Sequence, residues 1–206
     1  LLQRSRLDPV TLRRSEDAFV DELFEGVSAL GAPLLAAEFP RAFLDVNRSI
    51  TELDPGMFDG RLNVPADLPG PRVSAGLGVI PRIVRDGAEI YRGKLEPLEA
   101  GERLTRLYRP YHKALSQLIA QARMRFGTAV LIDCHSMPSA LGAPDIVLGD
   151  RYGASAAPAL SAAAEEAFVA SGFGVARNTH YAGGYTTVQH GQAGAGVHVL
   201  QIEINR

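Results

Sequence analysis

An aspartate and a histidine stand at the end of an apolar run in the middle of the chain. Residues 128–133 are nearly all apolar up to Asp133, and Cys134 and His135 follow. The run is typical of a central strand covered on both faces, and ligands of open α/β sheets bind at the carboxyl ends of strands. Alternation puts Asp133 and His135 on one side. Either Asp133 orients the imidazole, or His135 binds a metal while backbone groups fix its tautomer.

A simpler interpretation is that His135 only forms hydrogen bonds in a turn. The spacing alone leaves both interpretations open. The same alternation points Cys134 away from His135. For this thiol we expect packing rather than nucleophilic catalysis.

The last residues of the chain place a carboxylate in another strand pattern. Apolar residues at 200, 202 and 204 share one face, and the polar residues Gln201, Glu203 and Asn205 share the other. On a central strand, Glu203 must meet a metal, a substrate or a partner, because an unpaired buried charge is costly. Burial also raises the pKa of a carboxyl toward the range of a general base. An edge strand with one solvated face would require no such role.

Two arginines are candidates for binding a carboxylate. Arg48 closes the string Asp45-Val46-Asn47-Arg48, and Arg82 follows Pro81 at the end of a strand pattern. A guanidinium binds a carboxylate through two parallel hydrogen bonds, and the Asn47 amide adds directional ones. Arginines on loops are also commonly solvated, and both interpretations stay open.

Alternating helix and strand patterns position these residues. Ser15 is expected to cap a helix whose first turn carries Glu16 and Asp17 and which Gly31 ends. Pro110 is expected to kink or divide a helix over 101–126. The other expected elements are strands at 33–39, 42–46, 73–84, 128–133, 173–176 and 197–204, a loop at 47–72 and a helix at 155–171. This alternation indicates a three-layer α/β domain.

The composition excludes several classes of function. The chain has 206 residues, a net charge of −2 and one cysteine, so it predicts a single domain with no basic field for nucleic acid, no disulfide and no multi-cysteine zinc site. No apolar run is long enough to span a bilayer, and no signal peptide is apparent. We expect a cytoplasmic protein that binds no membrane and takes a small-molecule ligand. The sequence does not predict an oligomeric state.

These residues lie in a series of strings at 15–24, 39–48, 52–55, 76–82, 111–112, 131–139, 145–151, 181–185 and 200–206. The strings resemble the N-formylglutamate amidohydrolase family, which is related in fold to zinc carboxypeptidases and aspartoacylase. The resemblance implies a three-layer αβα fold with a mixed, mostly parallel central sheet, and hydrolysis of N-formyl-L-glutamate to formate and L-glutamate in histidine degradation.

The resemblance also implies roles for individual residues. His135 matches a ligand of the zinc ion, and Asp17 is the choice for its carboxylate ligand, with Glu16 and Asp21 within one turn. Glu203 matches the carboxylate that activates water. Asn47 and Arg48 match the pair that grips the substrate carboxylate, and Arg82 is expected at the second carboxylate.

The family's first histidine ligand belongs to a Pro-His-Ser-Gly string that is absent here. It is expected upstream of residue 1, so that 1–206 is one metallohydrolase domain lacking its N-terminal strand and C-terminal tail. The alternatives are a related zinc deacylase or carboxypeptidase-like hydrolase of another N-acyl amino acid, or a non-catalytic binding protein on the same fold.

Overall fold

The computed structural model describes residues 1–67, 70–84, 87–140 and 142–206. Its internal contacts divide the chain into two compact units. Unit 1 comprises Leu1–Glu16 and Ala36–Ala114, and unit 2 comprises Asp17–Leu35 and Leu115–Arg206.

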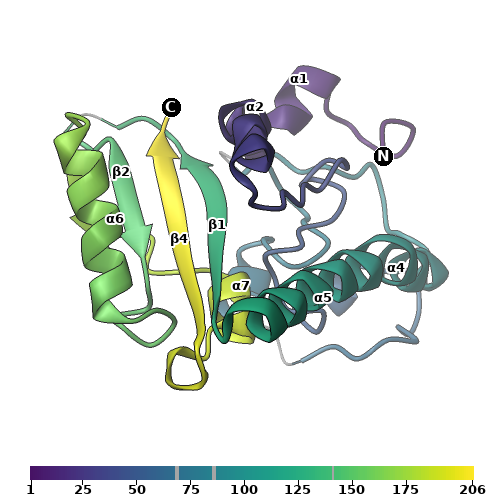
Figure 1. Ribbon diagram of the computed structural model, residues 1–206. Helices are drawn as coiled ribbons and strands as arrows, with labels where there is room; N and C mark the ends of the chain where they lie inside the picture. Colours follow the sequence, from purple (N-terminus) through teal and green to yellow (C-terminus); the bar gives the residue numbers. More distant parts are fainter. Residues whose placement is uncertain (68–69, 85–86, 141) are drawn as a thin grey trace. The chain divides into compact units, whose positions relative to one another are not determined.

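Unit 2 is built on a four-stranded mixed sheet with the order β1-β4-β2-β3. Figure 1 shows β1, β4 and β2 side by side in this order. Strand β1 pairs in parallel with β4, and β2 pairs in parallel with β3, whereas β2 and β4 are antiparallel. The strands are β1 (Ala129–Met137), β2 (Ile146–Gly149), β3 (Val175–Arg177) and β4 (Val197–Asn205). This sheet confirms the predicted α/β class with a mixed sheet.

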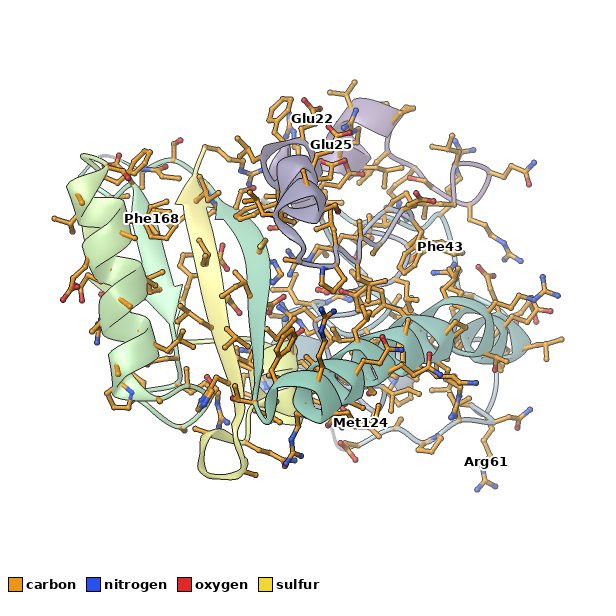
Figure 2. All side chains as sticks on the ribbon, in the orientation of Figure 1. Glu22, Glu25, Phe43, Arg61, Met124 and Phe168 are labelled. Atoms are coloured by element: carbon orange, nitrogen blue, oxygen red, sulfur yellow. The ribbon has the colours of Figure 1, made fainter. Side chains whose placement is uncertain are left out.

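Helix α6 (Pro158–Ala170) confirms the helix predicted at 155–171, and it covers one face of this sheet. Ala164 and Phe168 of the helix pack against Ile146 and Leu148 of β2 and Leu200 and Ile202 of β4. Phe168 lies between the helix and the sheet in Figure 2. Leu200, Ile202 and Ile204 of β4 therefore point to α6, and Gln201, Glu203 and Asn205 point to the opposite face.

The expectation that the 128–133 strand is central and covered on both faces is wrong. Within the described residues β1 pairs only with β4 and forms the edge of the sheet. Val130 is 49% exposed and Ile132 is 39% exposed. An apolar run does not distinguish an edge strand from a central one, because strand order is set by long-range pairing.

The first helical pattern begins later than expected. Ser15 is not its cap, since it ends a separate 3₁₀ turn (Arg13–Ser15) that follows helix α1 (Pro9–Leu12). Helix α2 (Val20–Phe24) begins after Phe19, whose φ of 65° is left-handed. A 3₁₀ turn (Glu25–Leu30) extends it to Gly31, with φ of 86°, which ends it as predicted. Asp17 therefore lies in the turn before α2 and not in the helix.

The predicted interruption near Pro110 is confirmed. Helix α4 (Pro97–Arg103) passes into a π-helical turn (Leu104–Tyr108) and then into α5 (Arg109–Phe126). Proline lacks the N–H that would bond one turn back, and its ring clashes with that turn, so a wider turn before Pro110 accommodates it. Gly127, with φ of 75°, follows α5.

Unit 1 contains short helices and turns where strands were predicted. The strands predicted at 42–46 and 73–84 are absent from its described residues, as is the one at 33–39, whose residues divide between the units. Helix α3 (Pro71–Ser74) and a 3₁₀ turn (Pro55–Met57) are present instead. Long-range backbone bonds still organise these loops, for example from Asp45 N to Val79 O at 2.8 Å. Apolar residues there are buried by loop packing rather than by a sheet, which a period of two cannot reveal.

The remaining elements of unit 2 are helix α7 (Tyr185–His190) and a 3₁₀ turn (Ala193–Ala195), both before β4. None of the helices in the described ranges combines the length and the hydropathy that crossing a membrane requires.

Candidate active site

His135 lies between two carboxylates at the carboxyl end of β1. Its Nε2 is 3.1 Å from Asp133 Oδ1, and its Nδ1 is 3.1 Å from Asp17 Oδ2. The backbone N–H of Ser136 donates to the other oxygen of Asp17 at 3.2 Å. Asp133 Oδ2 is buried and makes no hydrogen bond to any residue in the described ranges. The predicted proximity of Asp133 and His135 is confirmed, and His135 lies in strand β1 rather than in a turn.

Of the three acidic residues near 17, Asp17 directs its carboxylate to His135, with Oδ2 at 3.1 Å from Nδ1. Glu16 bonds Arg13 at 2.9 Å, and Asp21 is exposed on α2. The difference follows from the late start of α2, because the turn before it directs Asp17 at the end of β1.

The two carboxylates favour positive charge on the imidazole. Burial disfavours the charged ring, but the charge and hydrogen bond of Asp133, together with the hydrogen bond and charge of Asp17, outweigh it. They raise the pKa of His135 well above its ordinary value. The arrangement stabilises a proton or another cation beside this ring.

His135 and Asp17 are joined by a hydrogen bond whose length is also compatible with two ligands of one metal ion. Two donors of a tetrahedral zinc ion, each about 2.0–2.1 Å from it, lie about 3.3 Å apart. The 3.1 Å between Nδ1 and Oδ2 fits this spacing, and Asp133 on Nε2 would fix the tautomer that leaves Nδ1 as the ligand. In the described parts of the chain no third His, Cys, Asp or Glu joins them in a metal-binding group. His135 and Asp17 could thus supply two of the ligands of a metal ion.

Glu203 lies opposite His135 on the neighbouring strand. The two residues are register partners in the β1–β4 pairing, and Glu203 also pairs with Val147 of β2. Strand β4 is central, so the interpretation of an edge strand with one solvated face is wrong. Glu203 is 6% exposed, and its Oε1 accepts a hydrogen bond from Gln201 Nε2 at 2.8 Å. A buried carboxylate thus shares one face of the sheet with the imidazole.

Cys134 lies on the other face of β1, as alternation predicts. Burial, with a smaller effect of the Asp133 charge, raises the pKa of its thiol to about 12. A thiol that stays protonated at neutral pH is a poor nucleophile. Both the direction and the protonation of Cys134 therefore argue against a role as the nucleophile.

Asn47 and Arg48 lie in a hydrogen-bonded loop of unit 1. Asp45 Oδ1 accepts from the Asn47 backbone N at 2.9 Å, and Asp45 Oδ2 is 3.7 Å from Arg48 Nε. Arg48 donates through Nε to Leu77 O at 3.0 Å and through Nη1 to Asn47 O at 2.9 Å. These bonds fix the guanidinium on one side. Asn47 is 6% exposed, so the pair is not a solvated surface feature.

Asp45 is the buried counter-charge of this loop. Arg41 Nε lies 3.0 Å from Asp45 Oδ2. Burial alone would raise the pKa of Asp45, but the charges of Arg41 and Arg48 hold it below its ordinary value. Asp45 therefore stays ionised and keeps two cations in place.

Arg82 is held more loosely in the same unit. Its Nη1 is 3.5 Å from Glu89, its Nε is 3.7 Å from Asp54, and its side chain is 38% exposed. An added Cβ at Gly76, whose φ is 82°, would lie 3.4 Å from Arg82 Nη2. Arg48 bonds Leu77, the next residue, so both arginines adjoin the same turn.

Sequence reasoning missed two supports on the helix after Pro97. Tyr108 donates to Arg48 O at 2.8 Å, and His112 Nε2 lies 3.0 Å from Val46 O. Their rings, four residues apart on the helix, are 4.3 Å apart between centroids. The i, i+4 spacing was the available signal, but the loop carbonyls they hold are identified only by tertiary structure.

Comparisons with known proteins identify the family of the chain. The sequence model of the N-formylglutamate amidohydrolase family matches residues 1–206. The chain belongs to this family. It is an amidohydrolase, acting on an amide C–N bond.

Individual relatives extend the comparison. The chain is 31% identical to an N-formylglutamate deformylase of Pseudomonas aeruginosa and 28% identical to one of Pseudomonas putida, covering 91% of this chain and 68% of each relative. The crystal structure of N-formylglutamate amidohydrolase from Ralstonia eutropha is 37% identical, with a TM-score of 0.92 over 98% of this chain and 76% of that one. A gene product of Agrobacterium tumefaciens, 20% identical with a TM-score of 0.56 over 81% of this chain and 57% of that one, shares the fold alone.

Proposed function

We propose that this amidohydrolase cleaves N-formyl-L-glutamate to formate and L-glutamate. The observation that carries the proposal is the family match over the whole chain together with a buried carboxylate, Glu203, in register with His135. A deformylase needs a base to activate water and a cationic group for the substrate carboxylates. Glu203 is the candidate for the first and Arg48 the candidate for the second.

Glu203 is proposed as the general base. A carboxylate that accepts a proton from water can return it to the leaving amine, which is the sequence that amide hydrolysis requires. Its central strand fixes the backbone, and Gln201 holds one of its oxygens. The second carboxylate on this face, Asp133, is committed to His135.

His135 and Asp17 are proposed as two ligands of a divalent metal, with zinc the expected ion. Their 3.1 Å separation and the carboxylate on the far nitrogen of His135 support this assignment. A bound zinc ion lowers the pKa of its water to about 7 and polarises a carbonyl. Asp133 would then keep the imidazole oriented and Nε2 protonated.

Arg48 is proposed to bind a substrate carboxylate, aided by the Asn47 amide. The backbone bonds at Nε and Nη1 hold the guanidinium before substrate arrives, which reduces the ordering cost of binding. Arg82, adjoining the same turn, is proposed for the second carboxylate of a glutamate. We also propose that the reaction serves histidine degradation in the cytoplasm. The three-layer fold of zinc exopeptidases is proposed for the domain.

A substrate panel tests the function. Purified protein is assayed for amine release from N-formyl-L-glutamate, N-formyl-L-aspartate and N-acetyl-L-aspartate, with bound metal measured by elemental analysis. The highest kcat/KM for N-formyl-L-glutamate is expected, because a small acyl pocket rejects larger groups by contact. A higher kcat/KM for either other substrate would favour a related deacylase. No hydrolysis by metal-loaded protein would favour a binding protein.

Removing the metal tests the proposed metal site. Treatment with a chelator is expected to abolish turnover, and added zinc to restore it. The His135→Ala variant should hold less metal than the wild type after the same dialysis. Full activity in protein free of metal would overturn the assignment of His135 and Asp17 as ligands.

A further inference from the structure

We propose that Gln201 is a positioning residue that fixes the Glu203 carboxylate and couples it to the turn at Gly183–Gly184. The inference rests on the proposed role of Glu203 as the base. Gln201 and Glu203 are two residues apart on β4, so they share a face of the sheet. Both side chains are buried, at 4% and 6% exposure.

The Gln201 amide uses one donor and one acceptor. Its Oε1 accepts from the Gly184 backbone N–H at 2.7 Å, and its Nε2 donates to Glu203 Oε1 at 2.8 Å. A backbone N–H only donates, so it must face the amide oxygen, and the NH₂ group must then face Glu203. A carboxylate accepts only, so the pairing is satisfied in a single orientation of the amide.

The turn that anchors Gln201 is itself tightly packed. Gly183 has φ of 132°, and a Cβ there would lie 2.5 Å from Thr187 Oγ1 and 2.8 Å from Arg151 Cγ. Thr187 donates to Gly184 O at 2.7 Å, and Arg151 N donates to Ala182 O at 2.7 Å. These contacts leave the turn little room to move, so the hydrogen bond from Gly184 gives Gln201 a fixed reference.

The chain thus connects a rigid turn to the reacting carboxylate. A glutamate side chain has several rotatable bonds, and catalysis is sensitive to displacements of about 1 Å, which cost about 100-fold. Holding Oε1 by a neutral donor restricts these rotations without removing the negative charge that a base needs. A Gln at 201 is suited to this task, whereas an apolar residue would bury Gly184 N–H and Glu203 without the bond.

The competing explanation is that Gln201 only anchors the turn. Two variants together separate these roles. In Gln201→Glu the carboxylate still accepts from Gly184 N–H but offers no neutral donor to Glu203, and its charge also repels that of Glu203. A loss of turnover in Gln201→Glu is therefore interpreted beside that of the neutral Gln201→Met variant. The Gln201→Met variant has a similar volume and removes both bonds.

The experiment measures kcat and KM with N-formyl-L-glutamate for both variants in metal-loaded protein. The control changes are Gln117→Glu and Gln117→Met, because Gln117 is exposed on α5. We expect kcat to fall about 10-fold to 100-fold in both Gln201 variants, the range for supporting partners of reacting groups. KM should stay within about twofold, since the carboxylate-binding residues are untouched. The Gln117 controls should match wild type.

The crystal structure of Gln201→Met gives a readout that separates the two roles. A positioning role predicts a displaced Glu203 carboxylate, whereas an anchoring role predicts a displaced turn at 183–184 with Glu203 in its wild-type position. Wild-type kcat in Gln201→Glu at neutral pH, with the fold confirmed by its melting curve, would overturn the proposal. If Gln201→Met does not fold, Gln201→Leu replaces it in both measurements.

The result is distinguishable from failure of the proposed function. Absence of N-formylglutamate hydrolysis by wild type, or wild-type kcat in Glu203→Gln, would overturn the proposed function itself. An inactive Glu203→Gln with an unaffected Gln201→Glu would overturn only the role of Gln201.

Discussion

The charged groups of the sheet in unit 2 and those of the loops in unit 1 are held by different means. His135 and Glu203 are fixed by strand register, which places each opposite a known partner. Asn47 and Arg48 are fixed by single bonds from distant backbone, such as Leu77 O at 3.0 Å from Arg48 Nε. His135 and Glu203 are held by the regular backbone hydrogen bonds of the sheet. The positions of Asn47 and Arg48 depend on the conformation of a loop.

This difference has a consequence for function. Catalytic groups on strands are held more precisely than groups on loops, and loops tolerate adjustment to a ligand. A general base must stay aligned with the amide bond that is cleaved. An arginine that binds a substrate carboxylate must adjust to a flexible substrate. Substitutions in the sheet should therefore change kcat, and those in the loops should change KM or stability.

The largest effect is expected for the Glu203→Gln variant. Removing a general base costs about 100-fold to 10,000-fold, and we expect kcat to fall in this range with KM little changed. Steady-state kinetics with N-formyl-L-glutamate measures it. The matched control, Glu166→Gln on the exposed side of α6, should behave as wild type.

The Arg48→Lys variant is the corresponding test in unit 1. Lysine keeps the charge but loses the planar fork, and a lost charge-assisted hydrogen bond is worth about 1.5–3 kcal/mol, or roughly 10-fold to 150-fold in affinity. We expect KM to rise by about that factor and kcat to change less. A fall in kcat alone would contradict the division of roles between the two regions.

Asp45→Asn should affect stability rather than chemistry. We expect a loss of about 1.5–3 kcal/mol in the free energy of unfolding at neutral pH, from charge-assisted hydrogen bonds that an amide replaces poorly. The folded pKa of Asp45 is depressed, so its contribution is present above the unfolded pKa of about 3.9 and is lost as pH falls through the folded value.

Urea unfolding of wild type and Asp45→Asn checks this prediction at several pH values. The difference between the two proteins should be largest at neutral pH and shrink as the pH falls below about 4. A difference that is the same at every pH would mean that Asp45 acts through packing and not through its charge.

The smallest effect is expected for Arg82→Ala. The ion pairs of Arg82 are 3.5 Å and 3.7 Å long, and its side chain is 38% exposed. An ion pair of an exposed arginine with a substrate carboxylate contributes about 1 kcal/mol or less to binding, which corresponds to a rise of up to roughly fivefold in KM. The rise should occur with N-formyl-L-glutamate and not with N-formyl-L-glutamine, which lacks the second carboxylate. An equal rise with both substrates would place Arg82 elsewhere in the reaction.

Sequence reasoning succeeded where side chains repeat with a fixed period. The alternation over 200–205 predicted which face of the strand carries Glu203, and α6 packs against the other face. It failed at the start of α2, where a left-handed Phe19 delays the helix, and in 73–84, where loop packing buries apolar residues without a strand. Local pattern carries no information on such long-range packing.

The sequence by itself determined the family, the sheet class and the residue types available for chemistry. It could do so because motifs and alternation are properties of neighbouring residues. Only the tertiary structure decided that β4 is central and β1 an edge, that Asp17 rather than Glu16 or Asp21 meets His135, and that Gln201 links Glu203 to Gly184. Each of these features depends on contacts between segments that are distant in the sequence. Such contacts form where the folded chain both buries polar groups and supplies their hydrogen-bond partners.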